Sequence, residues 1–261
     1  MRPDAHNAAM RSESCRCGCD KRSSRHSHRK ANVAVKPWTY YYIGGNIRQP
    51  MKPRLPVIEA HEFADRDFIG GEAALDFINT VTGRDELPRD WLDSYERLLD
   101  WATRAQLLPE KNLKALRQEA RRSPAAAGSA LAGAKILRES LFALVSSLVR
   151  GATPPKSALE LLERHWVAGT EAHELRLEDS RLVAKVRGDA GNLDLVAALI
   201  AYRIVERVLP APPHRLRMCQ GGNCSWVFLD SSKAGGRRWC DMAVCGNAAK
   251  SRRFYDRSRR S

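Results

Sequence analysis

The sequence predicts a mainly α-helical protein with one short β-hairpin and a small cysteine-rich module at its C-terminal end. Three observations lead to this fold class. Apolar residues recur at three- and four-residue steps over most of the middle of the chain, which is the period of amphipathic helices. Apolar and polar residues alternate around residues 174–187, as in a hairpin. Four cysteines lie in two evenly spaced pairs between residues 219 and 245.

Charge divides the chain into three regions. Residues 1–56 contain 12 Lys and Arg against 3 Asp and Glu, residues 57–210 contain 21 against 24, and residues 211–261 contain 11 against 3. The net charge of +14 therefore lies at the two ends and indicates a polyanion partner, because neutralised phosphates release counterions. We expect a basic, disordered extension over 1–56, a helical regulatory domain over 57–210 and a cysteine module over 211–261.

The basic extension also carries cysteines and histidines. Its composition cannot build a core, so we interpret it as a solvated tail, or as sequence upstream of a start at Met51, rather than a second metal site.

No run of about eighteen apolar residues occurs, so no membrane span is expected. The start also lacks the apolar stretch of a secretory signal. In the basic extension, the cysteines and histidines whose pattern resembles a metal site are Cys15, Cys17, Cys19, His26 and His28.

The middle region predicts a series of helices. Apolar periodicity favours helices within 68–80, 94–105, after Pro109, over 129–149, from a cap at Ser157, and over 191–209. The 129–149 segment is apolar enough to be the central helix. The hairpin is expected to turn at Asp179-Ser180. Three prolines at 210, 212 and 213 indicate a stiff joint to the cysteine module.

The cysteine spacing is typical of a zinc site. Each pair encloses four residues, and fifteen residues separate the pairs. Zinc binds four thiolates tetrahedrally at about 2.3 Å. Two close pairs of cysteines therefore supply all four ligands of one structural Zn²⁺ and leave no position for a catalytic water. Two disulfides are the alternative, but they suit an oxidising compartment. The predicted ligands are Cys219, Cys224, Cys240 and Cys245.

The rest of the module follows from its local sequence. Residues 225–230 predict a short strand and 237–239 its returning partner across a turn at 231–236. The segment after Cys245 has helical propensity and a dense positive face. This outline indicates a zinc-ribbon-like or treble-clef-like module with four cysteine ligands, whose small core needs the metal for stability.

These residues resemble the CGNR zinc-finger family, regarded as bacterial transcription regulators whose finger binds DNA. The resemblance implies a cytoplasmic, nucleoid-acting DNA regulator. The arginine that gives the family its name is replaced by Ala248, which leaves the zinc site intact but removes any role of that arginine. The matching residues are Cys219, Cys224, Trp226, Phe228, Asp230, Arg237, Arg238, Trp239, Cys240, Cys245, Gly246, Asn247 and Lys250.

A second resemblance precedes the finger. The segment 68–80 is similar to the opening of the helical stress-induced transcription regulator (ABATE-type) domain that precedes CGNR fingers. It implies a domain that senses a ligand or mediates association. The matching residues are Gly70, Gly71, Leu75, Asp76, Asn79 and Thr80.

Basic side chains of the finger are the candidate contacts to double-stranded DNA. Lys250, Arg253 and Arg257 are spaced by three and four residues, so they share one face of a helix. We expect the aromatic residues Trp226, Trp239 and Phe254 to lie in the core of the module and not to stack on bases. The candidate contacts are Arg237, Arg238, Lys250, Arg252, Arg253 and Arg257.

One polar group in the helical domain is a candidate pocket. Asp76, Asn79 and Arg138 could bind a small effector, since a guanidinium fork can hold a carboxylate. A bridge or cap that fixes helix packing is the favoured alternative. No phosphate loop or catalytic carboxylate pair occurs, so no enzyme activity is expected.

The sequence thus predicts a zinc-dependent, DNA-binding transcription regulator that binds an effector or forms homo-oligomers. The alternatives are a finger that binds RNA or a protein, and a helical domain that binds a small molecule.

Overall fold

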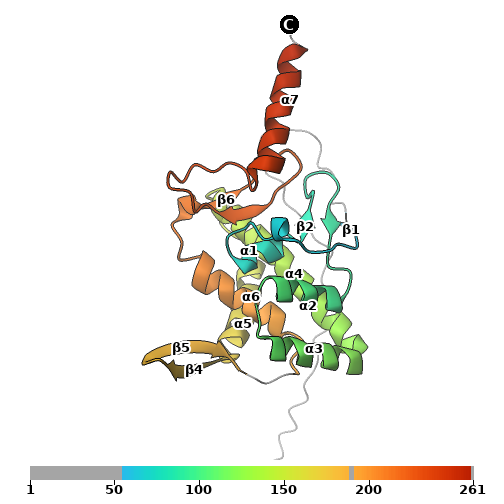
Figure 1. Cartoon of the computed structure of the whole chain (residues 1–261), viewed down its shortest axis with the longest axis vertical. Helices are drawn as coiled ribbons and strands as arrows, with labels where there is room; N and C mark the ends of the chain where they lie inside the picture. Colours follow the sequence, from blue (N-terminus) through green and yellow to red (C-terminus); the bar gives the residue numbers. More distant parts are fainter. Residues whose placement is uncertain (1–54, 188–190, 260–261) are drawn as a thin grey trace, which may run out of the picture. The chain divides into compact units, whose positions relative to one another are not determined.

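The computed structural model describes residues 55–187 and 191–259. The cysteines and histidines of the basic extension lie outside these residues. The mainly helical prediction is confirmed (Figure 1). The described residues form the helices α1 (Ala73–Ile78), α2 (Tyr95–Arg104), α3 (Glu110–Arg122), α4 (Pro124–Val149), α5 (Lys156–Glu171), α6 (Leu195–Arg203) and α7 (Asn247–Ser258).

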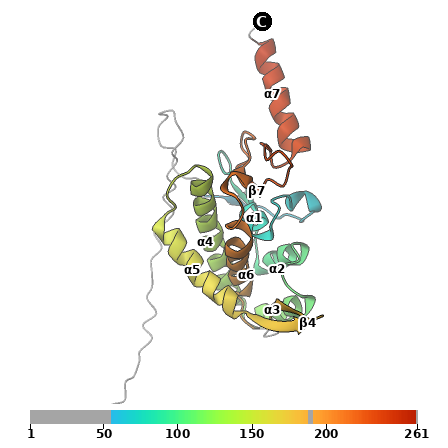
Figure 2. The same cartoon turned by 90° about the vertical axis from the view of Figure 1, so that its left-hand side faces the viewer.

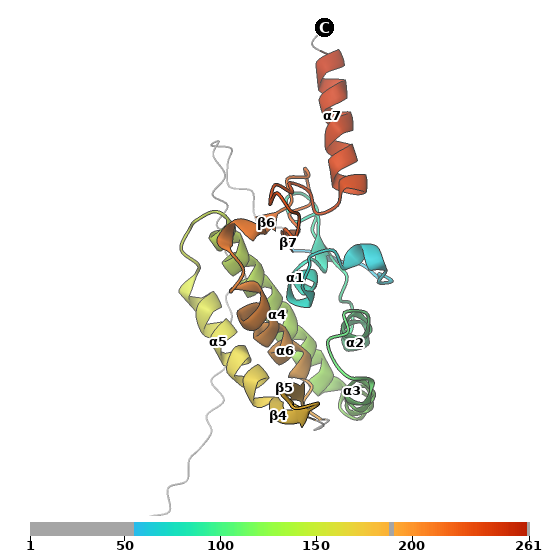
Figure 3. The same ribbon diagram turned by 60° about the vertical axis from the view of Figure 1, so that its left-hand side comes forward.

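The core lies around α4. Its buried face includes Leu137, Leu141 and Val145, each fully buried. Helices α5 and α6 run alongside α4, as Figures 2 and 3 show, and α1 and α2 also pack on it. This arrangement confirms the predicted central helix.

The starts of α4 and α5 differ from the prediction. Helix α4 begins at Pro124, five residues before the predicted start. Helix α5 begins at Lys156 directly after Pro155, so the predicted cap, Ser157, lies inside the first turn. A proline suits a helix start because its fixed φ is helix-compatible and its missing N–H is not needed there.

Helix α6 ends in a π-helical turn, η2 (Ile204–Val208), whose Ile204 and Val208 are buried. Together α6 and η2 account for the helix predicted over 191–209, although it begins only at Leu195.

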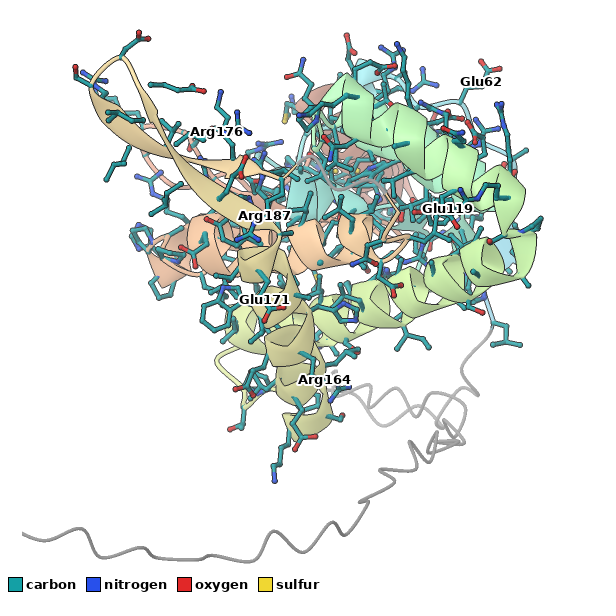
Figure 4. The ribbon with its side chains drawn as sticks, turned by 90° about the horizontal axis from the view of Figure 1, so that it is seen from below. Glu62, Glu119, Arg164, Glu171, Arg176 and Arg187 are labelled. Atoms are coloured by element: carbon teal, nitrogen blue, oxygen red, sulfur yellow. The ribbon has the colours of Figure 1, made fainter. Side chains whose placement is uncertain are left out.

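The predicted hairpin is confirmed as β4 (His173–Glu178) paired with β5 (Arg181–Val186). Asp179 and Ser180 both have positive φ, as a tight two-residue hairpin turn requires. Figure 4 shows the hairpin extending beyond the helices, with Arg176 along it and Arg187 near its base. Its leucines at positions 175, 177 and 182 are more than 70% exposed.

A small sheet has no counterpart in the prediction. Strands β1 (Val57–Ile58) and β2 (Val81–Thr82) flank β3 (Arg89–Asp90), parallel and antiparallel respectively. Two-residue strands are too short to show an alternating pattern. The sheet is nonetheless important, because its Asp90 anchors the central helix through Arg138.

The strand pairing predicted for the cysteine module is wrong. Strand β7 (Val227–Leu229) pairs with β6 (Leu216–Met218), which precedes the first cysteine, and not with 237–239. Leu216 and Val227 are buried in the main helical core, which places this pair at the junction of the module and the helices. Burial of these apolar side chains explains the choice, since segment 237–239 offers none of comparable burial. No helix in the described ranges is long and apolar enough to cross a membrane.

Candidate metal centre and nucleic-acid interface

The four predicted ligand sulfurs lie together. All lie within 4.8 Å of one another, and the Cys224–Cys240 and Cys240–Cys245 sulfur pairs are each 3.6 Å apart. A tetrahedron with zinc–sulfur bonds of about 2.3 Å has edges of about 3.8 Å. The sulfurs are therefore arranged to hold one zinc ion.

Local backbone structure brings each cysteine to the site. Cys219 directly follows β6, and its N–H donates to the Trp226 carbonyl at 2.7 Å. Cys224 closes a turn in which Asn223 has a φ of 74°, a value that asparagine tolerates. Cys245 lies in the π-helical turn η4 (Met242–Gly246), which Asp241 caps by accepting from the Val244 N–H at 2.9 Å.

The first knuckle fits a metal-bound sulfur. The N–H groups of Gly221 and Cys240 point at the Cys219 sulfur, at 3.4 and 3.3 Å, and would stabilise its thiolate. A Cβ on Gly221 would lie only 3.1 Å from the Cys245 sulfur, so the knuckle needs glycine to approach the site. Burial and the charge of Cys219 raise the pKa of the Cys245 thiol, and a bound divalent cation reverses such a shift.

A compact shell surrounds the ligands, and Arg237 belongs to it. Its guanidinium donates to the carbonyls of Trp239, at 2.9 Å, and Cys240, and lies 4.5 Å from the ring centroid of the fully buried Phe228. The Asp230 carboxylate accepts from the Arg237 backbone N–H at 2.8 Å. Arg237, a predicted DNA contact, is thus already bound within the module.

The module is attached to the helical domain by specific hydrogen bonds. The Asn79 side chain donates to the Val227 carbonyl and accepts from the Val227 N–H, both at 2.9 Å. The Gly70 carbonyl accepts from the Leu229 N–H at 2.8 Å. The Ser225 hydroxyl donates to the Asp85 carboxylate. Strand β7 is therefore held by β6 and by the two residues that flank α1, Gly70 before it and Asn79 at its C-terminal end.

Aromatic residues divide between this junction and the surface. Trp226 is 8% exposed and meets Trp91 edge to face at 5.9 Å between ring centroids, which confirms the prediction that it lies in a core. Phe254, another predicted core residue, is 65% exposed, and its neighbour Tyr255 is 66% exposed. That prediction is wrong because α7 has no packing partner along most of its length within the described part of the chain.

Helix α7 is the exposed, basic element of the module. Every residue in it except Ala249 is exposed, and Figure 1 shows it projecting away from the other helices. Its Lys250, Arg253 and Arg257 lie on one face, as their spacing predicts. Asp256 is its single acidic residue.

The three candidate pocket residues bind different partners. The Asp76 carboxylate accepts from the Gly70 N–H at 2.7 Å, and Asn79 binds Val227. Arg138 is fully buried and holds Asp90 with two hydrogen bonds, of 2.7 and 2.9 Å. The structure therefore uses these side chains for three separate attachments: one orders the loop before α1, one holds the finger, and one fixes α4 to β3.

The environment of Asp76 is unusual. Burial raises the pKa of this carboxyl to about 7; the Gly70 N–H opposes the shift, and the negative charges of Glu72 and Asp67 add to it. By contrast, two hydrogen bonds and the charge of Arg138 hold the pKa of Asp90 below its ordinary value despite burial. Asp76 is thus a buried acid to which no described basic side chain is bonded.

Two roles have no counterpart in the sequence-based prediction. Asn79, a predicted pocket residue, instead links the helices to the finger. Gly222 lies against the Arg252 guanidinium. A glycine pair in the knuckle is the signal that could have revealed the second role, because each glycine permits a different close approach.

Fold and site together define a helical domain joined to a zinc module with four cysteine ligands. Residues 215–258 match the family model described as "CGNR zinc finger", and residues 71–211 match ABATE, described as "Putative stress-induced transcription regulator". The chain belongs to this ABATE family and carries the CGNR finger after its ABATE domain. A search of curated proteins found no match. The domain and the finger are those of a zinc-binding regulator.

Proposed function

We propose that this protein is a transcription regulator whose zinc-ordered finger binds duplex DNA through α7. The observation that carries the proposal is the combination of exposure and charge on this helix. An exposed helix with a cationic face and little apolar contact to its own protein is typical of a surface that binds a polyanion.

The dimensions and attachment of α7 support the same proposal. Its 12 residues make a rod of about 18 Å that fits the major groove of B-form DNA. The zinc site, through η4, fixes the direction in which α7 leaves the module. Lys250, Arg253 and Arg257 are the proposed groove-facing residues, whereas Arg237 is excluded because its guanidinium binds inside the module.

We further infer that the helical domain regulates the finger through their shared junction. Because Asn79 and Gly70 hold β7, a change at α1 would reach the zinc module directly. An effector or a second copy of the chain that shifts α1 would act by this route. The proposed function needs no catalytic step.

A binding titration with labelled genomic duplexes tests the proposal. The triple variant Lys250→Gln, Arg253→Gln, Arg257→Gln should lose at least tenfold in affinity, since a single charged contact already contributes about tenfold. The matched control removes three charges from α3, which lies at the opposite end of the described unit (Figure 1), as Lys114→Gln, Arg121→Gln, Arg122→Gln.

The control should bind DNA as the wild type does. Equal losses in the two triple variants would mean that net charge alone drives binding. Weak duplex affinity without sequence preference, together with tight binding to single-stranded RNA, would favour the alternative of an RNA partner.

A further inference from the structure

A polar notch of about 210 Å³ lies where the first knuckle meets α7. Three stretches of chain form its walls: the knuckle, the segment before Cys240, and the first turns of α7. Three arginines face it against one carboxylate, so the notch is positively charged. Its principal lining residues are Gln220, Gly222, Arg238, Arg252, Arg253 and Asp256.

One wall of the notch is held in place by Gln220. The Arg238 Nε donates to the Gln220 side-chain oxygen at 2.7 Å, and the Gln220 N–H donates to the Arg238 carbonyl at 3.0 Å. The guanidinium also lies 5.2 Å from the ring centroid of Trp239. Within the described ranges its terminal nitrogens donate to no protein group, so an ordered pair of donors remains for a ligand.

A second part of the lining depends on a glycine. A Cβ on Gly222 would lie 2.2 Å from one terminal nitrogen of Arg252 and 3.0 Å from its Cζ. The Arg252 guanidinium therefore lies directly against the bare Cα of the knuckle. It forms no ion pair with any described residue, Asp256 included. Any larger side chain at position 222 would displace this guanidinium.

We propose that this notch binds a phosphate group, the phosphodiester of the DNA strand beside the groove that α7 enters. The guanidinium fork matches the geometry of phosphate oxygens, and Arg238 and Arg252 both line this notch, so two forks would bind one phosphate. Arg238 and Arg252 are then positioning residues that set the register of α7, and Lys250, Arg253 and Arg257 remain the groove-facing residues. This inference rests on the proposed function for the source of the phosphate.

The test compares three variants of the full-length, zinc-loaded protein. Gly222→Ala displaces Arg252 at constant charge, and Arg238→Gln removes the other guanidinium. Gly236→Ala is the matched control in the same finger, because a Cβ there meets nothing within 4 Å. Duplex affinity is measured as a function of salt concentration.

In the first two variants, the slope of log K against log salt concentration should become about 0.9 less steep. This change is the value for one phosphate contact. Affinity should fall by about tenfold, by the same factor for every duplex sequence, since phosphate contacts carry no sequence information. Gly236→Ala should match the wild type. Unchanged slopes, or losses of affinity that depend on the duplex sequence, would contradict phosphate binding in the notch. The proposal that α7 binds DNA would not be affected.

Inorganic phosphate is the second probe, followed through the Arg Nε–H signals in NMR spectra. Phosphate should shift the Arg238 and Arg252 signals in the wild type and in Gly236→Ala, and the Arg252 shift should vanish in Gly222→Ala. If phosphate produces these shifts while duplex DNA does not bind, the notch is a binding site for a free phosphate compound and the DNA proposal is wrong. If neither binds, both inferences are wrong.

Discussion

At the scale of single residues, Asn79 connects the two parts of the protein. Its amide satisfies both the N–H and the carbonyl of Val227 at a site from which water is excluded. A buried backbone group left without a partner costs about 1–3 kcal/mol. The side chain at the C-terminal end of α1 is therefore an important attachment of β7.

We expect Asn79→Ala to lower the free energy of unfolding by about 2–4 kcal/mol, because two buried backbone groups lose their partner. Urea unfolding measures this, and hydrogen exchange at the Val227 amide should accelerate. Asn247→Ala, at an exposed asparagine whose side chain has no hydrogen-bond partner among the described residues, should change stability by less than about 0.5 kcal/mol. A similarly small effect at Asn79 would show that the junction does not depend on this side chain.

Asp76 predicts a pH dependence. Its pKa is raised from 3.8 to about 7 in the folded protein, so the folded state binds this proton more tightly than the unfolded state between these values. The contribution of Asp76 to stability therefore falls as the pH rises from about 4 to about 7. Asp76→Asn removes this dependence.

Relative to Asp76→Asn, the wild type should lose roughly 2–3 kcal/mol of stability between pH 5 and pH 8. Urea unfolding of both proteins at the two pH values measures the difference. Parallel pH profiles for the two proteins would show that the carboxyl titrates normally.

At the scale of elements, we expect α7 to depend on zinc more than any other described helix. Isolated helices of about 12 residues are marginal in water, and only Ala249 of α7 is partly covered. Zinc holds η4, from which α7 continues without a break. Helix α4, by contrast, is packed in the main core.

A chelator should therefore raise amide exchange rates in α7 and the knuckles by at least tenfold, while the middle of α4 is affected much less, since local openings differ in free energy across a fold. Exchange monitored by mass spectrometry with and without chelator tests this. Equal protection of α7 in both conditions would mean that zinc does not order the helix.

The elements also show how far the sequence could lead. Helices with a clear apolar period, the hairpin at Asp179-Ser180 and the four cysteine ligands could all be predicted, because their signals are local. The β6–β7 pairing could not, since its energy comes from burial of Leu216 and Val227 against distant helices. Likewise, Arg138 could be selected as a buried arginine, but its partner Asp90 lies on a two-residue strand that leaves no periodic signal.

At the scale of the whole molecule, the zinc module and the helices share a hydrophobic core. Leu216 and Val227 belong to the same buried cluster as α4 and α6, although the ABATE match ends at residue 211. The boundary between the two family matches is therefore not a boundary in the packing.

Because of this shared core, zinc removal should lower the thermal midpoint of the helical part by several degrees, since metal bound only to the folded state stabilises everything that unfolds with it. Far-ultraviolet circular dichroism follows the helices, and the variant Cys240→Ser should reproduce the effect of a chelator. An unchanged midpoint would show that the finger unfolds independently.

The central claim is that zinc orders α7 for binding to DNA. The most direct test is a duplex titration of the full-length protein against pooled genomic fragments at two salt concentrations, before and after chelation and after zinc is restored. The account predicts selective, salt-sensitive binding that disappears on chelation and returns with zinc. Duplex binding that is the same with and without zinc would contradict it.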